Sequence, residues 1–327
     1  MSTVSRYLNG SLRVRPAVAE RIDGAVAALG YRPHPLARRL ATNSARTIGL
    51  LVPGITNPFF ARLAEELETS AYDHGGYSVL LCDTKSLASR EREYTELLSH
   101  GLVDGLVYCG MNPANEALAE AIERGLPVVL VDEDVEGLPP VPRVFVENAE
   151  GARRATAYLV SLGHRRIAYV GGPGELMTAR ERLRGHREAL EAASIAFDPA
   201  LARMGPYTDA FGFDAMNDLW RAGERPTAVL AANDYQAAGV MRAARALGLR
   251  VPEELSVVGF DDMPLSRYLT PALTTVHQPV EEIARQALDT LLGSIQGRDG
   301  AVMNRVLAVE LVVRESAAPP ASGRVGA

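Results

Sequence analysis

The stretch TIGLLVP, residues 47–53, begins the part of the chain that decides the fold. Its apolar residues run without the polar alternation of a half-buried strand, and a second apolar run, YSVLLC, follows at residues 77–82. Between the two runs, residues 59–74 have the apolar spacing of a helix. Continuous apolar strands joined by helices are typical of a parallel sheet that is covered on both faces. We therefore predict a strand–helix–strand unit at this point.

The same alternation continues and then restarts after Val144. The further apolar strands are GLVYC (105–109), PVVLV (127–131), RIAYVGG (166–172), TAVLAAND (227–234) and LSVVGFDD (255–262). Predicted helices separate them at residues 89–100, 113–124, 178–193, 211–222 and 236–247. The pattern predicts two similar α/β lobes in succession. In open sheets of this kind a ligand binds at the carboxyl ends of the strands, so we expect a binding cleft between the lobes.

The composition indicates a globular protein without metal or cofactor. No apolar run reaches the length of about 18 residues that spans a bilayer, and the amino terminus lacks the apolar core of a signal peptide. We therefore expect a cytoplasmic protein. Cys82 and Cys109 each end an apolar run and are expected to be reduced, buried thiols. Neither these cysteines nor the six histidines have the spacing of metal ligands.

Basic charge is concentrated at one end of the chain. Residues 1–47 contain eight arginines against Glu20 and Asp23, a net charge of +6, whereas the rest of the chain carries −12. Such a block on an acidic body is typical of a module that binds a phosphate backbone, although a run of charge is often only a solvated face.

Short helices are predicted within this basic segment. Residues 16–29 place apolar side chains at helical spacing, with Pro16 at the start and Gly30 just beyond the end. A helix beginning at Ser2 precedes it and is ended by the pair Asn9 and Gly10. One or two further turns are predicted at residues 35–40, before a linker.

Several separated motifs together resemble the lac-repressor/purine-repressor family of bacterial transcription regulators. In the order of the family they are STVSRYLNG (2–10), ALGYRPHPLARRLATNSARTIGLLVP (28–53), TNPFF (56–60), LGHRRIAYVGGP (162–173), RPTAVLAANDYQAAGVMRAARALGLRVPEELSVVGFDD (225–262) and TPALTTVHQP (270–279). The likeness covers nearly the whole chain, and the collinear set is more specific than any one motif.

The resemblance implies a homodimer that binds double-stranded operator DNA and a small effector. The expected fold is a two-lobed, periplasmic-binding-protein-like α/β core of doubly wound parallel sheets, preceded by a small all-α helix-turn-helix headpiece. We expect the headpiece at residues 1–46, with a hinge helix at about 35–41, and the core at 47–317. The first lobe would comprise 47–147 and 279–306, the second 148–278 and 307–317, and a disordered tail 318–327.

Residues of the expected recognition helix and hinge are candidates for DNA contact. Arg6 can donate two hydrogen bonds to a guanine edge. The alternative is that Arg6 is only a solvent-exposed residue of its helix. Leu40 matches the position from which family members insert an apolar wedge into the minor groove; its alternative is a contact inside the headpiece. The complete candidate set is Ser2, Thr3, Ser5, Arg6, Asn9 and Leu40, with Ser5 and Asn9 assigned to phosphates.

The expected effector site combines aromatic walls with polar side chains. Phe59 and Phe60 would face a ring, although the spacing of Phe60 to Leu63 and Leu67 also suits a core position. Arg182 and Asp261 match family positions that hold polar atoms of the effector; the alternative for Asp261 is that it only caps or turns the end of its strand. The candidate set is Phe59, Phe60, Asp132, Thr178, Arg182, Tyr207, Asn233 and Asp261.

Two departures from the family pattern carry information. Leu176 stands where the purine repressor has an arginine for its base, which favours a sugar or polyol over a purine as effector. Glu147 replaces the aspartate that is more usual at the junction between the lobes, so the geometry of the crossover is open. The sequence does not distinguish an inducer from a corepressor.

The chain begins within the expected recognition helix, ahead of which family members have another helix that buttresses it. Val4 and Leu8 would then lose apolar surface against which to pack. We therefore expect the natural start to lie upstream of Met1, which an intact-mass measurement of the native protein would decide.

Two other classes of protein are weaker interpretations. A periplasmic-type sugar-binding protein shares the two-lobed core, but it needs an export signal and has no use for a basic headpiece. An enzyme would need a nucleophile elbow, a phosphate-binding glycine loop or paired catalytic carboxylates, and none of these motifs stands out. We predict that the protein is not an enzyme.

Overall fold

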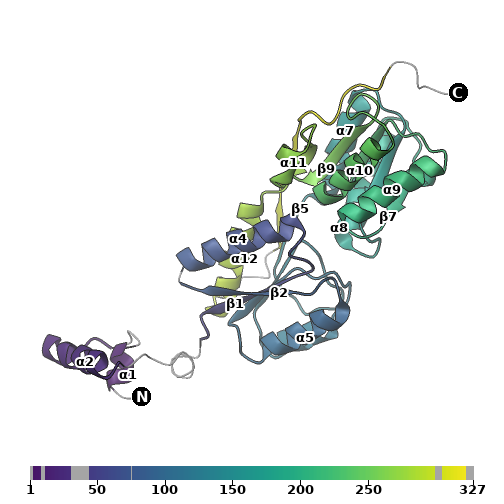
Figure 1. The fold of residues 1–327 in the computed structure, drawn as a ribbon. Coiled ribbons are helices and arrows are strands. Elements are labelled where there is room, and N and C mark those ends of the chain that lie inside the picture. Colours follow the sequence, from purple (N-terminus) through teal and green to yellow (C-terminus); the bar gives the residue numbers. More distant parts are fainter. Residues whose placement is uncertain (1–2, 9–11, 31–43, 75, 299–303, 322–327) are drawn as a thin grey trace.

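The computed structural model describes residues 3–8, 12–30, 44–74, 76–298 and 304–321 (Figure 1). The predicted hinge helix at 35–41 therefore lies outside the described residues, as do Ser2, Asn9 and Leu40.

Two helices form the described amino-terminal segment, α1 (Thr3–Leu8) and α2 (Pro16–Leu29). The second confirms the predicted helix at 16–29. Pro16 occupies the first turn, where its missing N–H costs no hydrogen bond. Gly30 adopts the left-handed conformation with φ of 58°, and its N–H closes the helix on the carbonyls of Val26 and Ala27.

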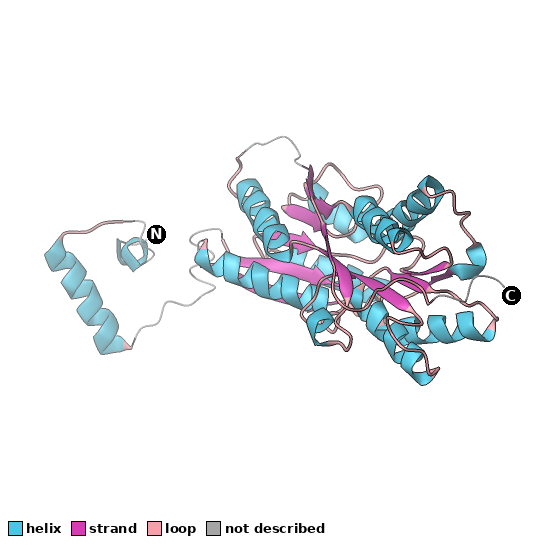
Figure 2. Cartoon of the chain, turned by 90° about the horizontal axis from the view of Figure 1, so that it is seen from above, coloured by secondary structure: helices cyan, strands magenta, loops and turns pink. Residues whose placement is uncertain are grey.

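Two six-stranded sheets make up the core, each in its own lobe (Figure 2). The first has the order β11-β5-β4-β3-β1-β2, with β1 (Thr47–Val52), β2 (Ser78–Asp83), β3 (Gly105–Tyr108), β4 (Val128–Val131), β5 (Arg143–Val146) and β11 (Asn304–Leu307). The second has the order β12-β10-β9-β8-β6-β7, with β6 (Ile167–Gly171), β7 (Ala202–Met204), β8 (Ala228–Ala231), β9 (Ser256–Asp261), β10 (Thr274–His277) and β12 (Glu310–Val312). The paired strands run parallel except β10 with β12. The doubly wound α/β fold is thus confirmed.

Helices join the strands and cover both faces of each sheet. In the first lobe these are α4 (Pro58–Asp73), α5 (Ala88–Ser99), α6 (Glu116–Glu123) and α12 (Val280–Ile295). In the second lobe they are α7 (Asn148–Ser161), α8 (Met177–Ala192), the short 3-10 helix η1 (Pro199–Leu201), α9 (Asp209–Arg221), α10 (Asp234–Ala246) and α11 (Leu265–Tyr268). Most predicted helix ends are correct to within two residues. The helix predicted at 113–124 starts later, because Asn115 caps α6 by accepting from Leu118 N.

The packing of the central strand β1 explains why its sequence is apolar throughout. Ile48 and Leu50 pack in the cluster that contains Leu63 of α4, whereas Leu51 packs on the opposite face with Leu98 of α5. Both faces of the strand are buried, so alternation with polar residues is absent. β2 differs, because it lies at the edge of the sheet and Leu81 is exposed. Our prediction of a fully buried strand at 77–82 was wrong in this respect.

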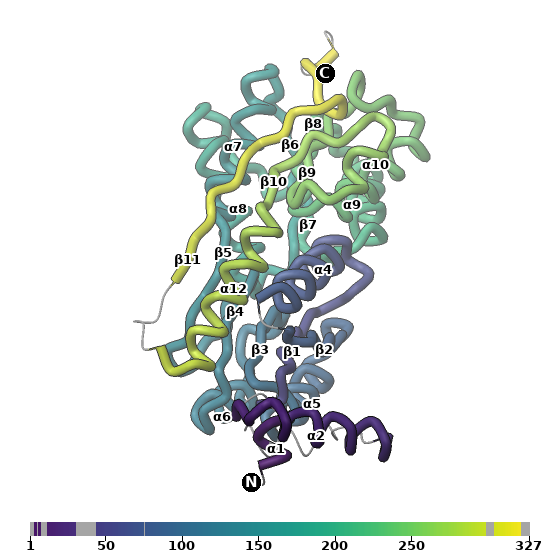
Figure 3. Tube along the Cα trace, turned by 90° about the vertical axis from the view of Figure 1, so that its left-hand side faces the viewer, coloured from purple at the N-terminus to yellow at the C-terminus, as the bar shows by residue number. Residues whose placement is uncertain are grey.

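The chain returns from the second lobe to the first before it ends. α12 follows the second-lobe strand β10 but packs against α4, β3 and β4, and β11 pairs with β5 (Figure 3). Leu307, which we assigned to the second lobe, pairs with Val146 in the first sheet, so the last crossing lies after it.

Two smaller expectations concern the cysteines and the tail. Cys82 and Cys109 are free and buried, as predicted, and burial raises the pKa of both thiols. The prediction of a disordered tail from 318 was wrong for its first residue. The Ala318 N–H donates to Ser256 Oγ at 3.0 Å, and its carbonyl lies 2.9 Å from His164 Nε2, which fixes this residue on the second lobe. Residues 322–327 lie outside the described chain.

Candidate functional site

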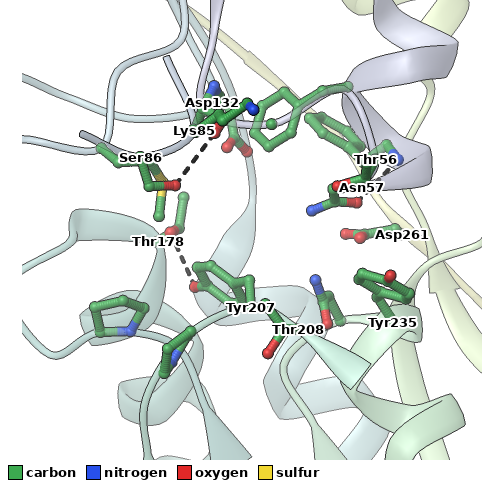
Figure 4. A pocket seen from close by; sticks show the side chains of 18 of the residues that line it. Thr56, Asn57, Lys85, Ser86, Asp132, Thr178, Tyr207, Thr208, Tyr235 and Asp261 are labelled. Atoms are coloured by element: carbon green, nitrogen blue, oxygen red, sulfur yellow. Dashed lines mark hydrogen bonds between the residues drawn. The ribbon is translucent and has the colours of Figure 1, made fainter. Parts of the chain in front are cut away.

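A cavity of about 500 Å³ lies between the two lobes at the carboxyl ends of their strands (Figure 4). The first lobe contributes Pro53, Gly54, Thr56, Asn57, Phe59, Phe60, Asp83, Lys85, Ser86, Met111 and Asp132. The second lobe contributes Pro173, Thr178, Arg182, Pro206, Tyr207, Thr208, Asn233, Tyr235 and Asp261, and Gln278 follows β10. Parallel strands bring these loops together because their carboxyl ends share one edge of each sheet.

The structure brings all eight predicted effector residues to this cavity. Phe59, Phe60 and Asp132 lie on the first-lobe side, and the remaining five lie on the second-lobe side. Their contact with an effector stays a prediction.

The aromatic wall is built by the first turn of α4. Asn57 caps this helix, accepting from Phe59 N at 3.1 Å, and Pro58 occupies the first helical position. The rings of Phe59 and Phe60 meet edge to face, with centroids 5.1 Å apart. Both residues line the cavity and also belong to the core cluster with Leu63. Phe60 therefore packs in the core, as its spacing to Leu63 and Leu67 predicts, and it also lines the cavity, while its contact with an effector ring stays a prediction.

Arg182 is the buried cation of the cavity floor. Its Nε donates to Asn148 Oδ1 at 2.8 Å, and its Nη1 donates to the carbonyl of Ala232 at 2.6 Å. The same Nη1 lies 3.7 Å from Asp261 Oδ1, and the guanidinium lies over the ring of Phe260, 3.9 Å from its centroid. These contacts fix the guanidinium, which can lie buried only because it is paired.

Two carboxyl groups that line the cavity, those of Asp132 and Asp261, have raised pKa values. Burial raises the pKa of Asp261 to about 7, against the opposing effects of Arg182 and of the Gln278 amide, which donates at 2.7 Å. Burial also raises the pKa of Asp132, and Arg182 again opposes it. Perturbed groups of this kind cluster where a polar ligand is to be bound.

Unusual backbone conformations surround the cavity. Asp132, Asp261, Lys85 and Ser86 adopt φ values of 68°, 114°, 53° and 55°. Positive φ values at residues other than glycine strain the backbone and are concentrated at functional sites. Here each ends or follows a strand, and the turn directs the residue into the cavity.

Asn233 combines two tasks. Its Oδ1 caps α10 by accepting from Gln236 N at 2.8 Å, while the residue lines the cavity. The neighbouring Asp234 is fully buried and accepts from Met263 N at 2.8 Å. Asp234 therefore has a structural role within the second lobe.

Sequence reasoning missed several lining residues that the strand ends could have indicated. Lys85 and Ser86 follow β2, Thr208 follows β7, Tyr235 follows β8, and Gln278 follows β10. For all of these except Thr208 the signal is a polar or aromatic residue one to four positions after an apolar strand. Thr208 follows the short segment Ala202–Met204, which is not apolar and gave no such signal. Leu176 is buried, does not line the cavity and places no polar group in it.

The candidate DNA-binding residues are only partly described. Thr3 and Arg6 are exposed on α1, and Ser5 lies within the same helix. Tyr7 donates to Asp23 Oδ2 at 3.0 Å, which ties α1 to α2. Ser2, Asn9 and Leu40 lie outside the described residues, so their roles stay predictions.

Two kinds of site were searched for across the described residues. They contain no group of His, Cys, Asp and Glu side chains arranged to hold a metal ion. Within the same ranges, no helix has both the length and the apolar character needed to cross a membrane.

Comparisons with known proteins agree with this architecture. Residues 1–34 match the model of bacterial regulatory proteins of the lacI family, and residues 156–317 match the periplasmic binding protein-like domain. The HTH-type transcriptional repressor CytR of Escherichia coli strain K12 is 34% identical over 315 residues, 96% of this chain and 92% of CytR.

Solved structures also match over nearly the whole chain. The transcriptional regulator CelR in its cellobiose complex is 33% identical, with a TM-score of 0.76, over 96% of this chain and 95% of CelR. The lac repressor dimer bound to operator and the anti-inducer ONPF is 30% identical, with a TM-score of 0.83, over 97% and 94% of the two chains. The resemblance seen in the sequence motifs is thereby confirmed. This chain belongs to the lacI family of bacterial regulatory proteins.

Proposed function

We propose that this protein is a transcriptional repressor that binds operator DNA through its amino-terminal segment and a sugar or polyol in the cavity between its lobes. The observation that carries the proposal is that residues of both lobes line the cavity. A ligand held in this way prefers one arrangement of the lobes, and it changes DNA affinity by as much as it discriminates between arrangements.

The lining chemistry supports a polyhydroxylated effector. Phe59 and Phe60 offer an apolar wall to the face of a ring. Asp132 and Asp261 can accept from hydroxyl groups, and Arg182 can donate to them. The buried position of Leu176 offers no polar partner to a purine base, and the relative CelR was solved with cellobiose.

The proposed partners are duplex DNA and a second copy of the chain. Arg6 and Thr3 would contact base edges, and Ser5 a phosphate. The lac repressor structure is a dimer on its operator, which supports a homodimer here. A repressor acts on the chromosome, so we place the protein in the cytoplasm.

A thermal-shift panel tests the ligand class. We expect at least one of D-ribose, D-glucose, cellobiose and D-sorbitol to raise the Tm in a concentration-dependent way, because a ligand of the folded state stabilises it by mass action. Adenosine serves as the purine control. A shift with adenosine alone would contradict the assignment of the effector class.

Selection from a random duplex library tests the DNA function. We expect an enriched sequence whose affinity falls steeply with salt, because bound arginines release counterions from the phosphates. A sugar that raises the Tm should change that affinity. Binding of a sugar without any selective attachment to duplex would instead indicate a sugar-binding protein with no DNA function.

A further inference from the structure

The helix α8 begins in the second lobe without a capping side chain of its own. The residue at its N-cap position is Leu176, which makes no side-chain hydrogen bond to the helix. Glu133, two residues beyond β4 of the first lobe, takes this place. Its Oε1 accepts from Met177 N at 2.6 Å, and its Oε2 accepts from Thr178 N at 3.2 Å. A carboxylate at this end also complements the helix dipole.

Glu133 is buried, so these bonds are shielded from water. Its carboxylate additionally accepts from Thr178 Oγ1 at 2.8 Å and from Asp134 N at 3.2 Å. Bonds to a charged acceptor in such surroundings are about twice as strong as neutral ones. The contact therefore links the first lobe to the first turn of a second-lobe helix.

The bond to Thr178 fixes the direction of a neighbouring one. Thr178 Oγ1 lies 3.1 Å from the hydroxyl oxygen of Tyr207, and either could donate (Figure 4). A hydroxyl has one proton, and the Glu133 carboxylate, which is ionised above a pH of about 7, can then only accept. Since Thr178 donates to Glu133, Tyr207 must donate to Thr178. The Tyr207 oxygen, which belongs to a residue lining the cavity, is then left only with acceptor capacity.

We propose that Glu133 is a positioning residue of the effector site, which holds α8 against the first lobe and sets the Tyr207 hydroxyl as an acceptor for a hydroxyl group of the effector. The inference rests on the proposed function for its ligand, but not for the contact between lobes. Glu133 itself does not line the cavity and acts through Thr178 and Tyr207.

Hydrogen–deuterium exchange of the ligand-free, full chain at pH 8, where Glu133 is ionised, tests the contact between lobes. In Glu133→Gln we expect the amides of Met177 and Thr178 to exchange about tenfold faster than in the wild type, because bonds to a charged acceptor are replaced by neutral ones. Glu136→Gln is the matched control, since it changes an exposed carboxyl group of the same segment and should leave exchange unaltered. Equal exchange in Glu133→Gln and the wild type would overturn the proposal.

A second variant separates the two roles of Glu133. Thr178→Val removes the hydroxyl but keeps the N–H group, so protection of the two amides should persist while the relay to Tyr207 is broken. We expect the affinity for whichever of D-ribose, D-glucose, cellobiose or D-sorbitol binds the wild type to fall about tenfold in both variants, the loss of roughly one hydrogen bond. A role in stability alone would lower the Tm without this loss of affinity.

The two proposals can fail separately. If none of the four compounds binds the wild type, the proposed effector class fails, and the exchange experiment still decides the contact of Glu133 with α8. If a compound binds both variants as tightly as the wild type, the positioning role fails and the effector class stands.

Discussion

Arg182 is the side chain on which the polar groups of the cavity floor converge. It comes from the middle of α8, yet its partners Asn148, Ala232 and Asp261 belong to three other segments of the second lobe. A buried cation is tolerated when such partners surround it, but removal of one member leaves the others unpaired.

We predict that Arg182→Met lowers the free energy of unfolding by about 3 kcal/mol, because Asp261 and the Asn148 amide oxygen lose their buried partner. The pKa of Asp261 should also rise above about 7, since Arg182 opposes the effect of burial. Urea unfolding followed by circular dichroism measures the first effect. Arg180→Met is the control, because Arg180 is exposed on the same helix; equal losses in the two variants would contradict the role of Arg182.

Helix ends are the elements that place polar groups at the cavity. Asn57, Thr208 and Asn233 cap α4, α9 and α10, and each lines the cavity as well. A capping residue has an extended backbone just before its helix, so its side chain lies at the strand-to-helix turn. In a parallel α/β lobe these turns are where the ligand binds.

For Asn233 the two roles can be separated by substitution. Asn233→Ala should cost about 1 kcal/mol of stability through loss of the cap to Gln236 N, and it should also weaken binding of the panel sugar. Asn233→Asp keeps a capping oxygen but loses the amide donor, so stability should be retained while the affinity still falls. Calorimetric titration and urea unfolding of both variants give the answer. An unchanged affinity in Asn233→Asp would show that the Asn233 amide group does not contribute to ligand binding.

The loop before β3 anchors the chain where it enters the core. Asp104 accepts from Ser44 Oγ at 2.6 Å, from Ala45 N at 2.6 Å and from Arg46 N at 2.8 Å. We predict that Asp104→Ala lowers the free energy of unfolding by about 2 kcal/mol, because three donors lose one acceptor. The control Asp73→Ala changes an exposed carboxylate at the end of α4 and should alter stability little. A loss in both variants alike would argue against this anchor.

At the scale of the whole molecule, Glu133 makes stability depend on pH. Burial and the nearby Asp132 raise its pKa from 4.5 to about 7. Between these values the folded protein keeps a proton that the unfolded chain releases, so the stabilisation is present below pH 4.5 and is lost as the pH rises through about 7.

The free energy of unfolding of the wild type should therefore fall, relative to Glu133→Gln, by roughly 2 to 3 kcal/mol between pH 5 and pH 8. The other ionisable or charged groups around this contact are Asp132, Asp134, Arg182, Tyr207 and Asp261, and all remain in both proteins. The difference between the two therefore isolates Glu133. Urea unfolding across this pH range provides the measurement, and a difference that does not vary with pH would contradict the raised pKa.

Local pattern was sufficient to predict much of the fold and of the candidate site. The unbroken apolar run at β1 predicted a strand buried on both faces, and Pro16 and Gly30 marked the ends of α2. The resemblance to the family then matched Arg182 and Asp261 to effector positions, and these two and the other six effector candidates all line one cavity. Lys85 and Tyr235 were missed because neither was matched to an effector position of the family, although each lies within four residues of the end of an apolar strand.

The sequence by itself determined the alternation of strands and helices, because hydrophobic periodicity and capping residues act over a few neighbouring positions. Only the tertiary structure decided that β2 is an edge strand and that Leu307 pairs with Val146. It alone brought Glu133 to the first turn of α8, since the two lie in different lobes. Strand order and the contacts between the lobes depend on packing between segments that are distant in the sequence. Such packing produces no periodic pattern in the local sequence from which it could be predicted.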